Sequence, residues 1–295
     1  MREFVILADS TSDLTKEMRQ EYNVDYVAMN YSVDDVEYKA SLDWETHSVK
    51  EFYDLMRNGK RVFTTQVPKN VYEETFLSII ESGKDILYIS CSSALSASIN
   101  AARLVAEELM QAHKDATICC VDSLISSLGQ GYLVMEASRK RAEGMSLADT
   151  AAYIESIKLC INQCGTPASL EYLRRAGRVK ASKAFFGNLF GVKPLIISDR
   201  KGQNYAYKKA KGAANARAAV AEHIREAADG EYDELLLTHA DCQEEIELLK
   251  EEILKVAPFK KVTISSIGPI VGASVGPGTV IAFCRGKEVM IEGNE

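Results

Sequence analysis

Residues 86–121 read ILYISCSSALSASINAARLVAEELMQAHKDATICCV, and this stretch decides the fold. Two short, apolar and partly β-branched runs, Ile86–Ser90 and Thr117–Val121, are typical of buried strands. Between them lie a turn of small residues and a helical pattern over Ser96–His113. A strand, a helix and a second strand in this order predict two parallel strands joined by a crossover helix.

The rest of the first half repeats this alternation. Phe4–Ala8 predicts a strand before a helix over about Leu14–Tyr22, and a long helix is expected over about Leu128–Gly144. Capping-box patterns at Ser48-x-x-Glu51 and Asn70-x-x-Glu73 predict two more helix starts. We therefore expect an α/β fold whose N-terminal part is a parallel sheet with helices on both faces.

The pattern changes near residues 145–165. A helix capped by Ser146 is expected to run to about Asn162, and the turn Asp199–Gly202 between strands Val192–Ser198 and Gln203–Tyr207 predicts an antiparallel hairpin. Further elements are expected at Leu170–Ala176, Ala213–Ala228, Glu234–His239, Glu244–Val256, Val262–Ser266 and Val280–Arg285. The sequence predicts two domains, 1–155 with a parallel sheet and 156–295 with a mixed or antiparallel sheet.

Composition excludes several classes of protein. The 295 residues include 35 Lys and Arg against 42 Asp and Glu, a net charge of −7, which argues against binding to nucleic acid or anionic membranes. The apolar run Phe4–Ala8 is too short for a secretory signal, and no run is long enough for stable membrane insertion. The seven cysteines, none spaced as C-x-x-C, predict buried thiols and a cytoplasmic protein.

Hydroxyl-rich turns follow three predicted strands, and a fourth precedes a helix start. They are residues 9–13 (DSTSD), 90–96 (SCSSALS), 122–127 (DSLISS) and 64–66 (TTQ). The carboxyl ends of parallel strands meet at one edge, where ligands bind, and free amides at helix starts favour an anion there. The alternative is that these side chains only cap helices.

Ionisable catalysts are scarce in the sequence. The four histidines lack metal-ligand spacing, so we expect no metal, and neither a G-x-S-x-G elbow nor a phosphate-binding G-x-x-x-x-G-K-[ST] loop is present. His239 fits a packed or capping residue better than a base. The glycine-rich run 268–278 permits close backbone approach to a ligand or is structural. The basic run 174–178 (RRAGR) is either a solvated helix end or a docking patch for an acidic partner or phosphate.

Taken together, these segments resemble the DegV family of bacterial fatty-acid-binding proteins. The resemblance spans nearly the whole chain and rests on the order of six segments: residues 9–13 (DSTSD), 64–66 (TTQ), 92–96 (SSALS), 122–123 (DS), 173–178 (LRRAGR) and 276–278 (GPG). Each segment is short, but their order and spacing are specific to that family.

The resemblance implies a two-domain α/β protein that holds one long-chain fatty acid, such as palmitate, stearate or oleate, in a tunnel between the domains. It also implies a separate fatty-acid kinase as partner, to which the carboxylate is presented. By motif position, the carboxylate-binding residues are Thr65, Ser96 and Ser274, with Ser93 and Ala97 beside them. Arg178 and Lys209 fall at positions implied to dock the partner.

The sequence departs from the family pattern at the head-group site. Ser274 stands where the family has a histidine, Ala97-Ser98 replaces Gly-Thr, and Val67 precedes the expected proline. These departures favour fatty-acid binding over acyl-phosphate formation. Two other readings remain open: an enzyme that acts on a small carboxylate or phosphate with a serine or Asp9 as nucleophile, and an acyl sensor that meets no kinase.

Overall fold

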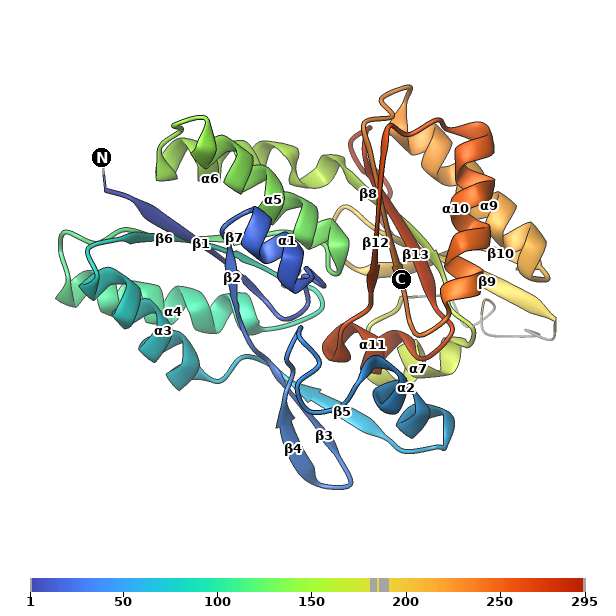
Figure 1. Ribbon diagram of the computed structural model, residues 1–295, viewed down its shortest axis with the longest axis horizontal. Helices are drawn as coiled ribbons and strands as arrows, with labels where there is room; N and C mark the ends of the chain where they lie inside the picture. Colours follow the sequence, from blue (N-terminus) through green and yellow to red (C-terminus); the bar gives the residue numbers. More distant parts are fainter. Residues whose placement is uncertain (1, 181–184, 186–190, 294–295) are drawn as a thin grey trace.

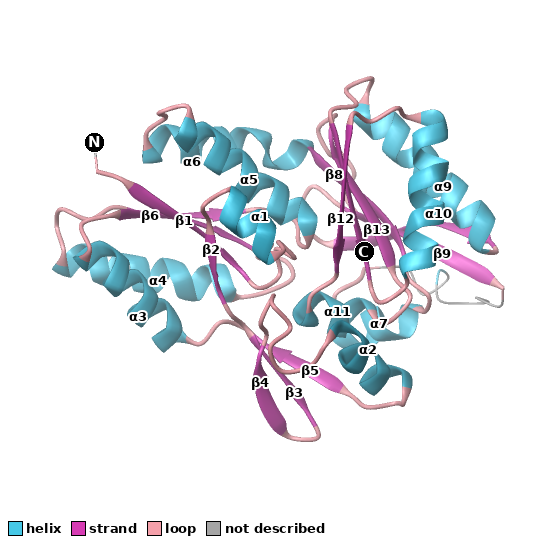
Figure 2. Cartoon of the chain, viewed as in Figure 1, coloured by secondary structure: helices cyan, strands magenta, loops and turns pink. Residues whose placement is uncertain are grey.

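The N-terminal half contains a fully parallel sheet. A computed structural model describes residues 2–180, 185 and 191–293. Strands β1 (Phe4–Asp9), β2 (Asp25–Val27), β6 (Asp85–Ser90) and β7 (Ile118–Asp122) pair in the order β2-β1-β6-β7, always in parallel. Helices α3 (Lys69–Glu81) and α4 (Ser98–Ala112) cover one face, and α5 (Leu128–Ala142) and α6 (Leu147–Ile157) cover the other (Figure 1 and Figure 2). The parallel sheet predicted for this half is confirmed.

Three helices of this half, α1, α2 and α6, begin at a residue whose side chain caps them. Ser48 forms the predicted capping box with Glu51 at the start of α2 (Val49–Arg57), and Thr15 caps the short helix α1 (Lys16–Glu21). The prediction for Asn70 is wrong, because Pro68 is already the residue that precedes α3 and Asn70 lies inside the helix. The Asn70 side chain instead donates a hydrogen bond to Glu74 over 3.5 Å.

The C-terminal half contains a mixed sheet of six strands. They are β8 (Ile161–Thr166), β9 (Val192–Ser198), β10 (Asn204–Lys211), β11 (Glu234–His239), β12 (Lys261–Ser266) and β13 (Val280–Arg285), in the order β10-β9-β8-β13-β11-β12. Only β11 and β12 run parallel. Helices α9 (Ala213–Ala228) and α10 (Gln243–Val256) pack on its outer face (Figure 1). The mixed sheet is as predicted.

Strand β8 corrects the sequence prediction of a helix through Asn162. Helix α6 ends at Ile157, and after the short 3-10 turn Lys158–Cys160 the chain enters the middle of the second sheet. All six residues of β8 are buried although only two are apolar, so their sequence, INQCGT, gives no strand-like pattern. The division of the chain at residues 155 and 156 stays a prediction.

Helix α5 connects the two sheets. It contacts β1 and β6 on one side and β8, β11 and β13 on the other. A helix enclosed in this way has no solvent face, and every residue from Leu128 to Ser138 is buried. Apolar residues of both halves, from Phe4 to Phe283, consequently share one core cluster, and a second cluster lies between the C-terminal sheet and helices α9 and α10.

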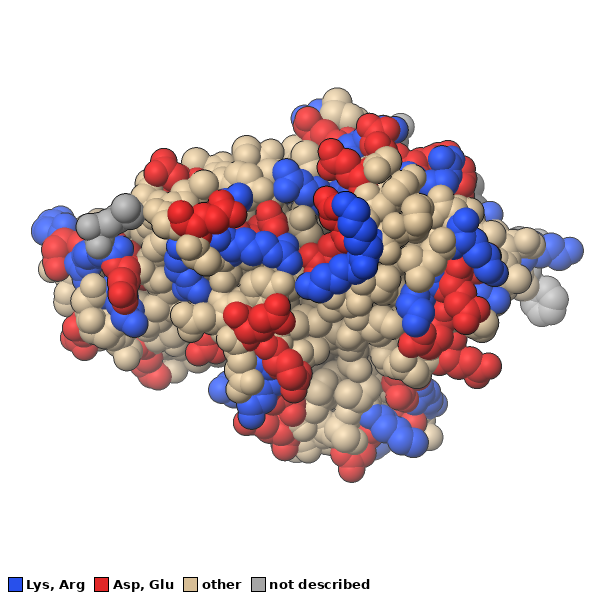
Figure 3. Space-filling view, turned by 45° about the horizontal axis from the view of Figure 1, so that its top comes forward, with Lys and Arg blue, Asp and Glu red and all other residues tan. Residues whose placement is uncertain are grey.

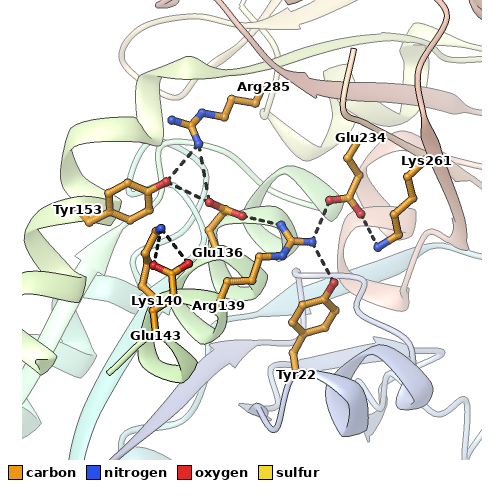
Figure 4. Close-up of polar contacts among 9 residues, drawn as sticks. All are labelled: Tyr22, Glu136, Arg139, Lys140, Glu143, Tyr153, Glu234, Lys261 and Arg285. Carbon is orange, nitrogen blue, oxygen red and sulfur yellow. Dashed lines mark hydrogen bonds and ion pairs between the residues drawn. The ribbon is translucent and has the colours of Figure 1, made fainter. Parts of the chain in front are cut away.

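A network of charged side chains joins the halves at the far end of α5 (Figure 4). Arg139 donates to Glu136 over 2.5 Å and, across the boundary, to Glu234 of β11 over 3.0 Å. It also donates to the Tyr22 hydroxyl over 2.9 Å, while Lys261 pairs with Glu234 at 2.9 Å. On the face drawn in Figure 3, acidic and basic side chains are interspersed.

A third, small sheet was not expected from the sequence. It has the order β4-β3-β5 and consists of β3 (Asn30–Val33), β4 (Val36–Lys39) and β5 (Val62–Thr65), all antiparallel. Strands β3 and β4 are joined by Asp34 and Asp35, which both have positive φ, as a tight two-residue hairpin requires. This sheet carries Thr64 and Thr65 to the edge of the molecule's central cavity.

Two further observations concern the whole described chain. All seven cysteines are free thiols, but the predicted burial is found only for Cys91, Cys164 and Cys284, and the other four are half-buried. Within residues 2–180, 185 and 191–293, no helix combines the length and the apolar character needed to cross a membrane.

Candidate functional site

A cavity of about 220 Å³ lies where the three sheets meet. The end of β5 and the turns after β6 and β7 form one side, and strands β8, β10 and β13 form the other. Helix α11 (Pro269–Val275) closes it with the apolar side chains of Ile270, Val271 and Val275. Both halves of the chain therefore contribute to its wall.

Hydroxyl groups from distant parts of the chain line this cavity. Thr65, Ser96 and Ser274, which lie 31 or more positions apart along the chain, all line it, and so does Ala97 at the start of α4. The Ser96 hydroxyl donates to Ser98 over 3.0 Å and accepts from the Ser98 amide over 3.3 Å, so the turn holds it in place. Four of the five predicted carboxylate-binding residues are thus brought together.

Ser93 is the exception among those five residues. It is exposed and does not belong to the residues that line the cavity. Its backbone amide donates to Asp122 over 3.1 Å, which fixes the turn after β6. The structure therefore assigns Ser93 to the outer side of the turn whose inner side carries Ser96.

The two residues predicted to dock a partner lie in different places. Arg178 lines the cavity and donates to the carbonyl of Leu95 over 3.2 Å. No carboxylate among the described residues pairs with it. Lys209 lies on β10, outside the residues that line the cavity, with its ammonium 4.7 Å from the ring centre of Phe185.

A second hollow of about 290 Å³ adjoins the first and shares Thr64, Arg178 and Ser274 with it. Its wall carries the cations Lys60, Arg61 and Arg175 as well as Arg178, and we call it the basic annex. Lys60 pairs with Asp34 and Arg175 with Glu171, whereas Arg61 and Arg178 have no carboxylate partner among the described residues. Cavity and annex together fall within the usual size of ligand pockets, about 300–1,000 Å³.

Asp9 does not line the cavity but stabilises residues that do. It is fully buried and accepts hydrogen bonds from the amides of Thr11 (3.0 Å) and Cys91 (2.9 Å), two residues that line the cavity. Tyr88 and Gln130 donate to it as well, at 3.1 and 3.3 Å. A carboxylate so fully engaged has no free lone pair for attack, which opposes the interpretation of Asp9 as a nucleophile.

The glycines of residues 268–278 serve helix α11. A side chain on Gly272 would meet the Tyr53 hydroxyl at 2.4 Å, and one on Gly276, whose φ is 78°, would meet Tyr172 at 2.2 Å. The predicted close approach is therefore real, but it is made to two tyrosines of the protein. It brings α11, and with it Ser274, against the rest of the cavity wall.

The other candidate catalysts have structural roles. Burial lowers the pKa of His239, whose Nδ1 accepts from the amide of Cys242 over 3.2 Å, so it closes a turn as predicted. Burial raises the pKa of Cys91 far above its ordinary value, which leaves the thiol a poor nucleophile. Among the described residues, no group of three or more His, Cys, Asp or Glu side chains is placed to hold a metal ion.

Sequence reasoning missed two polar residues of the cavity, Gln163 of β8 and Asn204 of β10. The Gln163 side chain donates to the Asn204 side chain over 3.1 Å. Gln163 was missed because β8 was read as the end of a helix. In a recognised central strand, a buried glutamine would have indicated a polar site, because a buried amide needs a hydrogen-bond partner.

Comparison with known proteins gives a consistent result. A sequence model of the family described as "Uncharacterised protein, DegV family" matches residues 3–285. A DegV domain-containing protein of Clostridium perfringens is 32% identical over 287 residues, covering 97% of this chain and 98% of that protein. A structure described as fatty acid binding of a DegV family protein from Thermus thermophilus is 26% identical, with a TM-score of 0.88 over 97% of this chain and 100% of that one.

Two more distant structures show the same fold. A protein described as DegV, a fatty acid binding protein from Bacillus subtilis, is 23% identical with a TM-score of 0.84, over 97% of this chain and 100% of that chain. A stearic-acid-binding protein from Eubacterium ventriosum is 22% identical with a TM-score of 0.86, over 96% of this chain and 98% of that chain. The cavity described above therefore lies in a fold whose solved examples include proteins described as binding fatty acids.

Proposed function

The chain belongs to the DegV family, and we propose that it binds one long-chain fatty acid in the cavity between its two large sheets and carries it chemically unchanged. The observation that carries this proposal is the cavity itself, whose wall combines apolar side chains, among them Ile270, Val271 and Ile281, with hydroxyl side chains that include Thr65, Ser96 and Ser274. That arrangement matches a ligand with a long apolar tail and one polar head. The proposal extends to a division of roles in which residues 1–155 contribute the carboxylate-binding turns with Thr65 and Ser96, and residues 156–295 contribute Ser274 and close over the tail.

Burial of the acyl tail should supply most of the binding free energy. Burying about 14 methylenes at about 0.8 kcal/mol each provides on the order of 11 kcal/mol before ordering costs. Each hydrogen bond to a charged head group adds only about 1.5–3 kcal/mol. The tail therefore determines affinity, and the hydroxyl groups determine which way round the ligand lies.

At the head-group end, Thr65 and Ser274 would donate to a carboxylate, and Ser96 would do so after its hydroxyl turns away from Ser98. The guanidinium of Arg178, which has no carboxylate partner among the described residues, also lines the cavity and supplies a compensating positive charge. Among the described residues that line the cavity there is no His, Asp, Glu or Lys that could act as a general base, which supports binding without chemistry.

We further propose that the carboxylate is presented to a separate fatty-acid kinase in the cytoplasm, with Arg178 and Lys209 on the docking face. The basic annex supports this part of the proposal, because it opens beside the head-group residues and adds cations that a phosphate or an acidic partner would meet. Because Ser274 stands where the family has a histidine, we expect the bound fatty acid to be phosphorylated slowly. The same site would serve an acyl sensor that meets no kinase.

Native mass spectrometry tests the binding proposal. The purified protein is stripped of lipid, incubated with palmitate or oleate, and weighed; one acyl chain per monomer is expected. Val271→Trp places a large side chain in the cavity and should abolish the complex with the fatty acid. Leu104→Trp, on the exposed face of α4, should leave the complex unchanged. Wild-type protein that stays free of ligand after incubation contradicts the proposal.

A further inference from the structure

The amide side chains of Gln163 and Asn204 form a polar pair inside the acyl cavity. Gln163 is 6% exposed, and its Nε2 donates to Asn204 Oδ1 over 3.1 Å. No described group donates to Gln163 Oε1 or accepts from Asn204 Nδ2. The pair therefore retains one unused acceptor atom, Gln163 Oε1, and one unused donor group, Asn204 Nδ2, and both residues line the cavity.

The position of this pair separates it from the head-group site. A smaller cavity of about 20 Å³ shares Gln163, Asn204, Val275 and Ile281 with the main cavity. Its remaining wall includes Leu173 and Ile196 and none of the three head-group hydroxyls. The polar pair thus lies where the main cavity meets an apolar extension, along the path of a bound tail.

The sheet fixes the orientation of the pair. Gly165 of β8 pairs with Ile196 of β9, and Asn204 of β10 pairs with Ser198 of β9, so Gln163, Ser198 and Asn204 form a row across three strands. The Ser198 hydroxyl is engaged with the carbonyl of Leu124 at 3.3 Å. Within this row, the polar atoms left without a described partner are therefore Gln163 Oε1 and Asn204 Nδ2, and strand pairing holds both residues in place.

We propose that the cavity prefers a long-chain fatty acid that carries a hydroxyl group on its chain, away from the carboxylate. This inference rests on the proposed function and narrows its substrate class. A hydroxyl both donates and accepts, so it satisfies Gln163 Oε1 and Asn204 Nδ2 together, whereas a plain methylene leaves both without a partner. Because the two amides approach the chain from one wall, the site also distinguishes the two enantiomers of such an acid.

Competition binding tests this preference on the wild-type protein. Stearic acid and a series of hydroxystearic acids, each with the hydroxyl at a different carbon, compete for the delipidated protein, and the two enantiomers of the best isomer are then compared. The best isomer should bind about three- to tenfold more tightly than stearic acid, with one enantiomer favoured. Stearic acid binding at least as tightly as every isomer overturns the inference and leaves the proposed function intact. If no fatty acid binds at all, the proposed function fails and the inference falls with it.

Variants locate the preference. Gln163→Met and Asn204→Leu keep the side-chain volume but remove the polar pair, so the ratio of hydroxystearate to stearate affinity should fall to about one. Gln243→Met is the matched control, since Gln243 is exposed at the start of α10, does not line the cavity, and its side chain donates to Glu247. A ratio that persists in well-folded Gln163→Met and Asn204→Leu proteins shows that another group reads the hydroxyl.

Discussion

The carboxylate of Asp13 accepts a hydrogen bond from the backbone amide of Gly268 over 2.8 Å, and this contact ties the turn after β1 to the start of α11. Its other oxygen accepts from the Ser127 hydroxyl at 2.5 Å, at the start of α5. One buried carboxyl group thus holds together two helix starts that border the cavity, one from each half of the chain.

The buried Asp13 carboxyl group should make the protein less stable as the pH rises. Burial raises its pKa from 3.8 to about 7, while its hydrogen bonds with Ser127 and Gly268 act against the shift. A carboxyl group with a raised pKa in the folded state contributes stability that is fully present below about pH 4 and is lost as the pH rises through about 7. Asp13→Asn should therefore remove an unfavourable charge above pH 7 and flatten the profile.

The measurement is urea unfolding of both proteins at pH 5 and pH 8. We compare the unfolding free energy of Asp13→Asn with that of the wild type at each pH. This difference should be more favourable to the variant at pH 8 than at pH 5, by on the order of 2–4 kcal/mol. Asp233→Asn is the control, because Asp233 is exposed and pairs only with Lys260 at the surface. Parallel profiles for wild type and Asp13→Asn would show that this group does not titrate in the range.

Removal of single head-group hydroxyls should weaken binding without abolishing it. Thr65→Val and Ser96→Ala each remove one donor to a carboxylate and should cost about 1–3 kcal/mol of binding free energy, while the buried tail retains the ligand. Ser93→Ala, from the outer side of the same turn as Ser96, should have no effect. Isothermal titration with palmitate compares the three; unchanged affinity in both test variants places the carboxylate elsewhere.

Arg139 should be one of the more important charged residues for stability. Its loss leaves Glu136 and Glu234, whose side chains are 10% and 8% exposed, short of a counter-charge. Lys261 and Arg285 compensate in part, so Arg139→Met should cost about 1–3 kcal/mol of unfolding free energy. Arg225→Met, which breaks a surface pair with Glu222 on one helix, should cost much less. Equal losses in urea unfolding would contradict this.

Gly272 and Tyr53 should be energetically coupled. A methyl group on Gly272 collides with the Tyr53 hydroxyl, so Gly272→Ala should displace α11 and cost about 1–3 kcal/mol in stability. In a Tyr53→Phe background the oxygen is absent and the added cost should be smaller, although Tyr53→Phe itself loses the 2.7 Å hydrogen bond to the carbonyl of Ile267. A double-mutant cycle measures this coupling, and strict additivity would refute it.

The sequence predicts the regular parts of this fold well because they are locally encoded. Strand β6 is buried at all six positions and reads as an apolar run, and Ser48 and Ser146 cap their helices by contacts three residues away. Strand β8 is encoded differently: Asn162, Gln163 and Gly165 become strand residues only because β9 and β13 pair with them. Distant pairing of this kind leaves no local signal.

The same distinction applies to the site. Thr65, Ser96 and Ser274 could be named from short motifs, and the structure brings them to one cavity. Gln163 and Asn204 belong to no motif, since their importance comes from facing each other across β9 in the wall of that cavity. The role of the glycines in α11 was equally hidden, because the tyrosines they accommodate lie far away in the sequence.

Ser274 provides the sharpest test of kinase partnership. It is half-buried on α11 and lines both the main cavity and the basic annex. A serine hydroxyl can donate one hydrogen bond to a carboxylate, but unlike histidine it cannot carry a positive charge or exchange a proton near neutral pH. Fatty-acid binding should therefore be normal in the wild-type protein, while acyl-phosphate formation with a fatty-acid kinase should be slow. Ser274→His should raise the rate, and Ser274→Asn, which adds a neutral side chain of intermediate size, should not. A coupled kinase assay on proteins holding equal amounts of palmitate measures all three, and rapid turnover by the wild type would show that no imidazole is needed at this position.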